Sequence, residues 1–203
     1  MRWGPRSGWV VIAALAGQAG QGCRRAAEEP PAPQVKPASA IAASSPPGRC
    51  VWPTPATPPP PVPPGPAPGC PRDPHPHTLD LVTVRFPEAD AGPAQVSAEL
   101  ARAPEDTERG LMFRTSMDEG HGMLFDLGSH KVQEFWMRNT CIPLDMIFLD
   151  DDGLVVGILE NVPTLNEVPR SVPCESSYVL EVNAGWSRRA GVRAGIRARL
   201  PGA

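Results

Sequence analysis

Six side chains stand out as able to bind or react: Arg114, Trp136, Arg138, Asn139, Asp145 and Glu181. Four of them fall in the segment EFWMRNTCIPLDMIFLDDDG (134–153), between two apolar runs. A bare carboxylate among apolar neighbours costs several kcal/mol, so it must be hydrogen-bonded, paired or protonated. Two interpretations follow. Either these groups converge on a ligand in a concave site with Trp136 or Trp186 as an apolar wall, or they form a buried polar network that only holds the fold.

Asp145 is the clearest anomaly in this segment. Alternation along a strand at 144–149 places Asp145 on the face that carries Ile147 and Leu149. Arg114 and Arg138 are the partners we expect for its carboxylate. Asn139 and Thr140 follow a strand, where such side chains commonly bond to backbone groups of a turn.

An acid–base reaction is the alternative to simple binding. Asp145 and Glu181 are the two carboxylates we would pair in a hydrolase or lyase. The sequence contains none of the G-x-S-x-G, H-E-x-x-H, Walker or Rossmann motifs. We therefore favour a binding module over an enzyme, and a purely structural envelope protein is the third interpretation.

No metal and no cofactor are expected. Methionine thioethers can select Cu(I), but the five methionines of residues 78–203 are scattered through apolar blocks and read as core. The run Asp150-Asp151-Asp152-Gly153 offers oxygens to Ca²⁺. It lacks the alternating acids of a twelve-residue calcium loop, so we interpret it as a solvated turn.

Charge is divided unevenly along the 203 residues. Residues 78–203 hold 12 Lys/Arg and 19 Asp/Glu, a net charge of −7. Such an acidic domain is a poor match for the phosphate backbone, so we expect no nucleic-acid partner. Its length is sufficient for one domain with a core of its own.

The first 22 residues have the layout of a signal peptide: a basic start, an apolar run from Trp9 to about Ala16, and small residues. The small residues before Cys23 resemble a bacterial lipoprotein cleavage site, although Gly20 stands where such sites usually have Leu. We expect export, with a membrane anchor on Cys23 as one outcome. Cleavage near Ala19 without lipid is the other.

Residues 23–77 form the expected linker. Nineteen of the 28 prolines lie between Pro30 and Pro76, and large apolar residues are few. Such a segment buries too little surface to offset the entropy of ordering, so we expect it to be disordered. If Cys23 is lipidated, an extended chain of this kind could hold the domain on the order of 100 Å from a membrane.

Four cysteines remain if Cys23 carries lipid, an even number that suits an oxidising compartment. Three pairings are possible, and we favour Cys50–Cys70 with Cys141–Cys174. The second bond would contribute roughly 3–4 kcal/mol by the chain-entropy account. Zinc spacing is absent from the sequence.

Residues 78–203 predict a mainly β fold. Alternating or β-branched runs predict strands at 78–86, 94–101, 122–127, 134–139, 144–149, 154–162, 177–185 and 195–200. Asp151-Asp152-Gly153 between two apolar runs indicates a hairpin. Short helices are expected after Pro104 and near Trp186, and a turn at 128–131. We predict a compact β-sandwich or barrel of seven or eight strands with one or two helices.

Several of these blocks resemble the family named domain of unknown function 192 (DUF192). The blocks are RGLMFRTSM, GMLFDL, FWMRNTCIPLDMIFLDDDG and YVLEVNAGW, and together the likeness spans about residues 96–200. The resemblance implies a compact β-rich domain, often exported, in bacteria and archaea. It implies no established activity and carries no catalytic residues. The positions that match its polar blocks are Arg114, Arg138, Asn139, Thr140, Asp145 and Glu181.

Taken together, the sequence predicts an exported protein of the bacterial periplasm or cell envelope, possibly lipid-anchored. Its domain would bind a small polar molecule or an envelope component.

Overall fold

The structure is a computed structural model that describes residues 48–202. The expected signal peptide (1–22), Cys23 and the first half of the Pro-rich segment lie outside the described residues. Within residues 48–202, no helix has both the length and the apolar character needed to cross a membrane.

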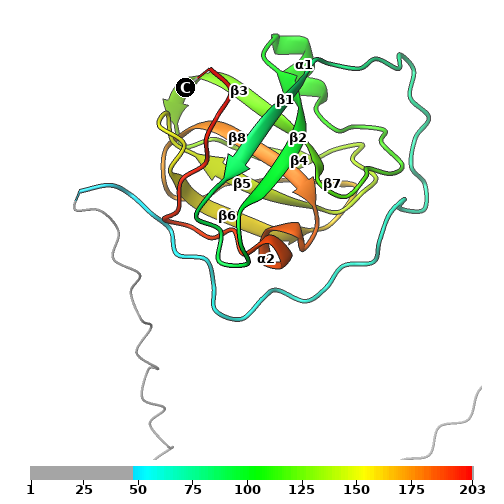
Figure 1. Ribbon diagram of the computed structural model, residues 1–203. Helices are drawn as coiled ribbons and strands as arrows, with labels where there is room; N and C mark the ends of the chain where they lie inside the picture. Colours follow the sequence, from blue (N-terminus) through cyan, green and yellow to red (C-terminus); the bar gives the residue numbers. More distant parts are fainter. Residues whose placement is uncertain (1–47, 203) are drawn as a thin grey trace, which may run out of the picture. The chain divides into compact units, whose positions relative to one another are not determined.

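The main element is a six-stranded sheet with the order β1-β2-β3-β8-β5-β6 (Figure 1). Its strands are β1 (Leu81–Phe86), β2 (Ala94–Ala101), β3 (His121–Lys131), β5 (Leu144–Leu149), β6 (Val155–Val162) and β8 (Ser176–Asn183). Neighbours are antiparallel except β2 and β3, which run parallel. The predicted mainly β fold is confirmed. It has eight strands in two sheets, and the sheets do not close into a barrel within residues 48–202.

A second sheet consists of β4 (Phe135–Met137) and β7 (Asn166–Arg170). β4 is shorter than the predicted strand at 134–139, because the chain turns at Asn139, whose φ is 52°. The sequence did not predict β7, which contains Pro169. Proline donates no backbone hydrogen bond, but each strand of a two-stranded sheet has one open edge where none is needed.

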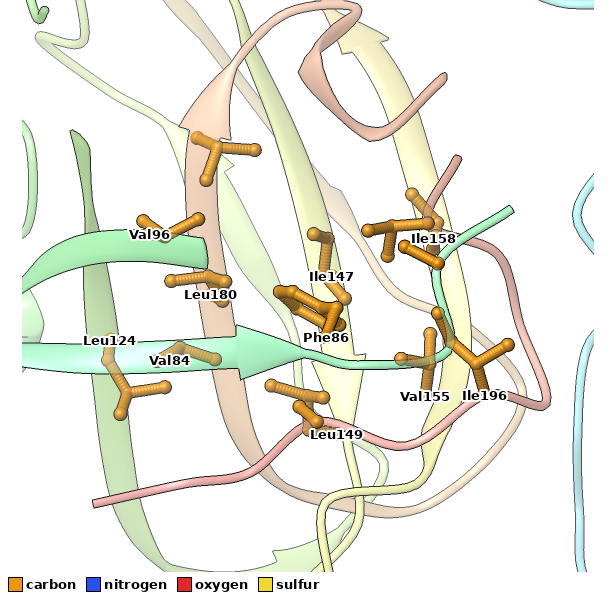
Figure 2. Close-up of a cluster of buried hydrophobic side chains, with 14 of the residues drawn as sticks. Val84, Phe86, Val96, Leu124, Ile147, Leu149, Val155, Ile158, Leu180 and Ile196 are labelled. Atoms are coloured by element: carbon orange, nitrogen blue, oxygen red, sulfur yellow. The ribbon is translucent and has the colours of Figure 1, made fainter. Parts of the chain in front are cut away.

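The large sheet has an apolar core on each face. Residues alternate along β5, so Ile147 and Leu149 join one core, whereas Met146 and Phe148 join the other. Figure 2 shows the first core, where Phe86 of β1 and Leu180 of β8 pack with Ile147. Every residue of β5 is buried, and the two faces predicted for this strand are confirmed.

The predicted hairpin is confirmed, and the C-terminal segment packs against it. Gly153 has a φ of 79°, and a Cβ there would lie 2.2 Å from the carbonyl oxygen of Ala198, so glycine is required at this turn. The segment predicted as a final strand forms only isolated bridges, from Arg197 to Leu154 and from Arg199 to Arg85 of β1. It therefore links the two ends of the large sheet.

Two short helices are present, α1 (Pro104–Arg109) and α2 (Trp186–Ala190), as predicted. Pro104 at the first turn of α1 costs no helical hydrogen bond, since an N–H at this position would have no partner within the helix. The helix ends at Gly110, with a φ of 51°, and a Cβ at this position would lie 3.0 Å from the ring of Phe125. The glycine lets the chain pass directly over that ring.

The turn predicted at 128–131 lies inside a strand. β3 runs on to Lys131 and changes register against β8 between Asp126 and Lys131, with Gly128 at a φ of 59°. The buried amide of Gln133 donates to the carbonyl oxygens of Ser129 and Ser176, at 2.8 and 2.9 Å. Gln133 thereby provides hydrogen bonds to two backbone carbonyl groups at the irregular end of β3.

Residues 48–77, which we call the strap, follow the surface of the domain (Figure 1). The amide of Trp52 donates to the carbonyl oxygen of Val156 in the edge strand β6, at 2.7 Å. Trp52 also packs on one core and Val51 on both. The amide of Ala67 bonds to the carbonyl oxygen of Cys141, at 2.8 Å. For this part of the linker, the expectation of a disordered chain is wrong.

The cysteine pairing we favoured is also wrong. The disulfides join Cys50 to Cys174 and Cys70 to Cys141. The prolines between Cys50 and Cys70 favour an extended chain, on the order of 60 Å along its contour. Each end of this stretch therefore reaches a cysteine of the folded domain rather than its neighbour in sequence.

Candidate functional site

A cavity of about 400 Å³ lies between α1, the large sheet and the β4–β7 sheet. Its lining comes from five segments: residues 107–112 of α1 and its C-terminal turn, Phe125 and Leu127 of β3, residues 133–136 with Thr140, Pro169 of β7, and Glu181 of β8. Apolar or aromatic side chains make up about half of the lining, and polar or charged side chains make up the other half. A cavity of this size with apolar and polar groups in its lining can hold a small molecule.

Glu181 is the most buried polar residue of the cavity lining. It lies in the middle of β8, between Met123 of β3 and Met146 of β5. Its residue is 4% exposed, and burial raises the pKa of its carboxyl to about 8. No hydrogen bond or ion pair to this carboxyl comes from residues 48–202, so burial acts on it without compensation. A buried carboxyl of this kind is held protonated at neutral pH and is able to donate a hydrogen bond.

The apolar wall consists largely of aromatic rings. Phe125 and Phe135 meet edge to face, with ring centroids 5.1 Å apart, and Phe135 packs in the same way on Phe148. Trp136 lies nearer the surface and is 41% exposed. Trp136 is among the lining residues, and its role as an apolar wall of a binding site stays a prediction.

Arg109 connects this cavity to the strap. It belongs to the lining, and its guanidinium donates to Asp73 of the strap at 2.5 Å. The hydrogen bond from Arg109 is the main cause that lowers the pKa of Asp73. The guanidinium also lies over the ring of Phe113, 5.1 Å from its centroid. The position of the strap therefore bears directly on a side chain of the site.

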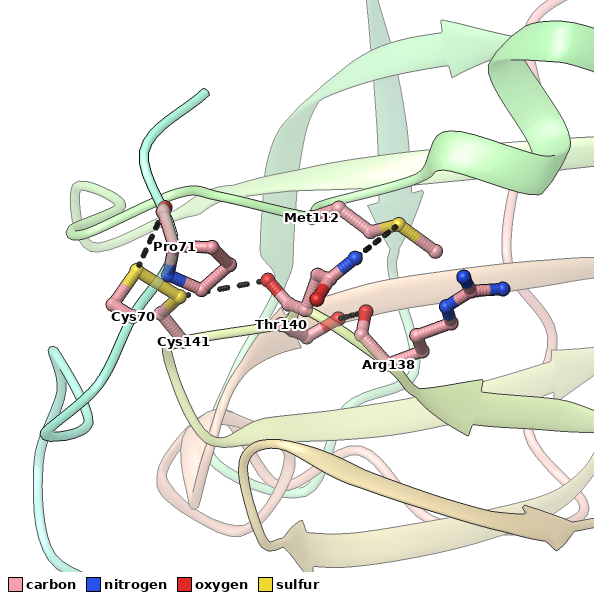
Figure 3. Close-up of a disulfide and its surroundings, with 7 residues drawn as sticks. Cys70, Pro71, Met112, Arg138, Thr140 and Cys141 are labelled. Carbon is pink, nitrogen blue, oxygen red and sulfur yellow. Dashed lines mark hydrogen bonds between the residues drawn. A yellow bond between two sulfur atoms is a disulfide. The ribbon is translucent and has the colours of Figure 1, made fainter. Parts of the chain in front are cut away.

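Arg138 and Asn139 lie in a shallower groove beside the cavity. This groove shares Glu108, Arg109 and Met112 with it. The side-chain amide of Asn139 donates to the sulfur of Met112 at 3.9 Å. Figure 3 shows Arg138 and Thr140, the neighbours of Asn139 in sequence, near the Cys70–Cys141 disulfide. The guanidinium of Arg138 lies 5.9 Å from the ring centroid of Trp136.

Arg114 lies in a different part of the molecule. Its guanidinium donates to Glu99 of β2 at 2.7 Å, and it lines a separate depression with Ser97 and His121. The structure therefore does not bring Arg114 into the cavity with Trp136 and Glu181.

Asp145 is fully buried and is held by backbone groups rather than by arginine. Its carboxylate accepts from the amides of Asn161 and Gly185, each at 2.9 Å, and of Ser187, at 3.0 Å. The partners we expected, Arg114 and Arg138, do not contact it. Three backbone donors tie the end of β6 and the start of α2 to β5, which is a structural role.

The two carboxyls proposed for acid–base chemistry lie on opposite faces of the sheet. In the register of β5 and β8, Glu181 pairs with Met146 and Asp145 pairs with Val182. Since side chains alternate, Glu181 shares the face of Met146, and Asp145 shares the face of Val182. A single substrate cannot contact both groups.

Two arginines pair with the aspartates at the tip of the hairpin. The ligand atoms of Asp150, Asp151 and Asp152 lie within 4.8 Å of one another. Arg49 of the strap donates to Asp150 at 2.8 Å, and Arg197 pairs with Asp152. Burial alone would raise the pKa of Asp152, but hydrogen bonds from these two arginines lower it to about 2. The cluster works as an attachment point for the strap.

The sequence did not indicate much of the cavity lining. It identified Trp136 and Glu181, but not Phe125, Phe135 or Arg109, which complete the lining. Each of these reads locally as an ordinary strand or helix residue. The only local signal was Gly110, because a glycine at the end of a short helix indicates a close approach of the backbone to another group.

Comparison with known proteins identifies the family of the domain. Residues 86–200 match the model of the DUF192 family, described as an uncharacterized ACR, which is more than half of the 203-residue chain. No curated protein matched the sequence.

Two solved structures are similar. One is from Sinorhizobium meliloti 1021 and is described as a proposed transcription regulator. It is 37% identical with a TM-score of 0.60, over 64% of this chain and all of that one. The other is a protein of unknown function from Novosphingobium aromaticivorans DSM 12444. It is 36% identical with a TM-score of 0.57, over 60% of this chain and 86% of that one.

Proposed function

The chain belongs to the DUF192 family, and we propose that its β domain is a binding module for a small polar ligand, held in the cavity around Glu181. The observation that carries this proposal is a buried carboxyl that lines a cavity of about 400 Å³ and has no partner within residues 48–202. A ligand in the cavity would supply the hydrogen-bond partner that the described residues do not give to this carboxyl.

The alternative of a hydrolase or lyase loses its support. It required Asp145 and Glu181 together, and the sheet separates them. Glu181 alone remains in the cavity as a buried acid. A group that donates or accepts one hydrogen bond to a bound molecule suits recognition, whereas the acid–base mechanism considered needs two groups on one substrate.

We propose that the protein works in the cell envelope of a bacterium. Two disulfides fasten the strap to the domain, and such bonds persist in oxidising compartments. A lipid anchor on Cys23 remains part of the proposal, since it would explain an export signal followed by a Pro-rich spacer. We propose no nucleic-acid partner, because residues 78–203 carry a net charge of −7.

A fragment screen followed by amide chemical-shift mapping tests the binding proposal. The full chain with both disulfides formed would be screened against aromatic fragments in neutral, cationic and anionic forms. We expect hits to shift the amides of Gly110, Phe125 and Glu181 and to leave the hairpin at Gly153 unchanged.

A blocked cavity provides the control. Leu127 lines the cavity and is only partly buried, so Leu127→Trp should fill the site without overpacking the core. We expect this variant to lose the hits. Fragments that map elsewhere, or that bind the blocked variant equally well, contradict the proposal.

A further inference from the structure

The polar part of the cavity lining holds more acidic than basic side chains. Glu108, Glu134 and Glu181 contribute three carboxyls, against one basic side chain, Arg109. Arg109 already donates to Asp73 at 2.5 Å, outside the lining. Within the part of the chain that the structure describes, no other basic side chain lines the cavity. A bound anion would therefore meet acidic groups and one arginine that is already paired.

The aromatic wall favours the opposite charge. The faces of Phe and Trp rings attract cations, with a strength that increases when water is excluded. Phe125, Phe135 and Trp136 bring three rings to one cavity. At the rim, the guanidinium of Arg138 already lies 5.9 Å from the ring centroid of Trp136. The deeper rings have no such partner among the described residues.

Building on the binding function proposed above, we propose that the ligand is a small organic cation, an alkyl- or arylammonium, whose nitrogen contacts Glu181 while its apolar body lies against the phenylalanine rings. The lining supplies both halves of this recognition: a buried acid and aromatic rings. A neutral alcohol would gain one hydrogen bond to Glu181. A carboxylate ligand would gain the same bond but would be repelled by the other acidic side chains of the lining.

Binding of a cation has a consequence for protons. The carboxyl of Glu181 is neutral in the empty cavity at neutral pH, because burial disfavours its charged form. A cation favours the ionised form. The carboxyl therefore gives up its proton to solvent as the ammonium binds, and the complex holds a carboxylate beside an ammonium. The side chains next to Glu181 on β3 and β5 are uncharged methionines, and the other titratable side chains of the lining are Glu108, Glu134 and Arg109. We assign the proton to Glu181, because burial raises the pKa of its carboxyl to about 8.

Isothermal titration of the full, disulfide-bonded chain tests the charge of the ligand. The probes are 2-phenylethylammonium, 2-phenylethanol and phenylacetate, which share a phenyl body and differ in charge. We expect the ammonium to bind at least tenfold more tightly than the alcohol, and phenylacetate to bind most weakly. Titration at pH 7 in two buffers of different ionisation enthalpy should show release of close to one proton per ammonium bound.

Glu181→Gln provides the matched variant, since it keeps the shape and removes the charge. We expect it to lower ammonium affinity at least tenfold, to change alcohol affinity by less than threefold, and to abolish proton release. Phe135→Leu should lower the affinity for the ammonium probe more than the affinity for the alcohol probe. An intact thermal transition in each variant shows that the loss comes from the site.

The outcomes separate the two proposals. Alcohol or phenylacetate binding at the cavity as tightly as the ammonium overturns the cation proposal and leaves the binding function standing. Failure of all three probes also overturns it, and the fragment screen then decides the binding function separately. If Glu181→Gln binds the ammonium probe as tightly as the wild type does, Glu181 does not contact the ligand and the cation proposal is overturned.

Discussion

Glu181 and Asp145 are buried carboxyls on neighbouring strands with contrasting surroundings. Three backbone amides surround Asp145, whereas Glu181 faces a cavity without a partner from residues 48–202. Burial is common to both residues, so burial alone does not distinguish a structural carboxyl from a candidate binding group. The hydrogen-bond donors around each one make that distinction.

The unfolding free energy of the wild type should fall as pH rises, and Glu181→Gln should not show the part of this fall that comes from Glu181. The carboxyl titrates near 4.5 in the unfolded chain, and burial raises its pKa to about 8 in the folded protein. Between these values the folded state holds a proton that the unfolded chain has lost. The unfolding free energy therefore falls as pH rises through this window, by up to about 1.4 kcal/mol per pH unit, and Glu181 adds no further change above it.

Urea unfolding of wild type and Glu181→Gln between pH 4 and 9 measures this effect. The difference between the two curves should grow from pH 4.5 to pH 8 and then level off. Glu167→Gln, at an exposed position of β7, is the control. Parallel curves for wild type and Glu181→Gln would show that Glu181 does not hold its proton.

Asp145→Ala should destabilise the domain by about 3 kcal/mol or more. The substitution leaves three backbone donors without an acceptor, and each buried unpaired group costs roughly 1–3 kcal/mol. Equilibrium unfolding in urea gives the value. The same variant should bind cavity ligands normally at temperatures where it remains folded. A loss below about 1 kcal/mol would contradict the structural role.

At the scale of elements, the strap is the feature that distinguishes this chain from a bare β domain. It covers the edge of β6, pairs with the acidic hairpin through Arg49 and reaches the cavity through Asp73. An exposed strand edge invites pairing with other chains, and covering it prevents this. The strap therefore protects the sheet and also fixes one side chain of the cavity.

Removing the Cys70–Cys141 bond by a double substitution to Ser should lower the unfolding free energy. The bond closes a sequence separation of 71 residues, for which the chain-entropy account gives roughly 4 kcal/mol. Denaturant unfolding without reductant measures the change. Loosening this part of the strap should also weaken the hold of Asp73 on Arg109, which would appear as amide shifts around the cavity.

Cys50 and Cys174 provide the comparison for this experiment. Their bond lies at the other end of the strap, near the acidic hairpin, so its loss should destabilise the fold but leave the cavity amides in place. Equal effects of both double variants on the cavity would contradict a local link from Cys70 to Arg109.

At the scale of the whole molecule, the two disulfides and the proposed export belong together. Protein purified from its host and digested without reductant should yield the linked peptides Cys50–Cys174 and Cys70–Cys141. Its intact mass should be four hydrogens below that of the reduced chain. Added lipid mass on the peptide that begins at Cys23 would support the anchor. Four free thiols would contradict both the pairing and the proposal of export.

The sequence by itself determined the local elements of this protein. Alternation predicted the six strands of the large sheet, the glycine after two aspartates predicted the hairpin, and the faces of β5 followed from its period of two. The same local patterns carried the family resemblance. Such features depend on residues that are adjacent in the chain, so they can be read without knowing what packs against them.

The tertiary structure alone decided which distant residues meet. It separated Asp145 from Glu181 by placing them on opposite faces, paired each strap cysteine with the domain, and brought Arg109, Phe125 and Glu181 to one cavity. These contacts join segments far apart in sequence, and they arise from the order of strands in the sheet and the packing on its faces. A period of two fixes the face on which a side chain lies within its own strand. Only the assembled sheet determines what lies opposite it.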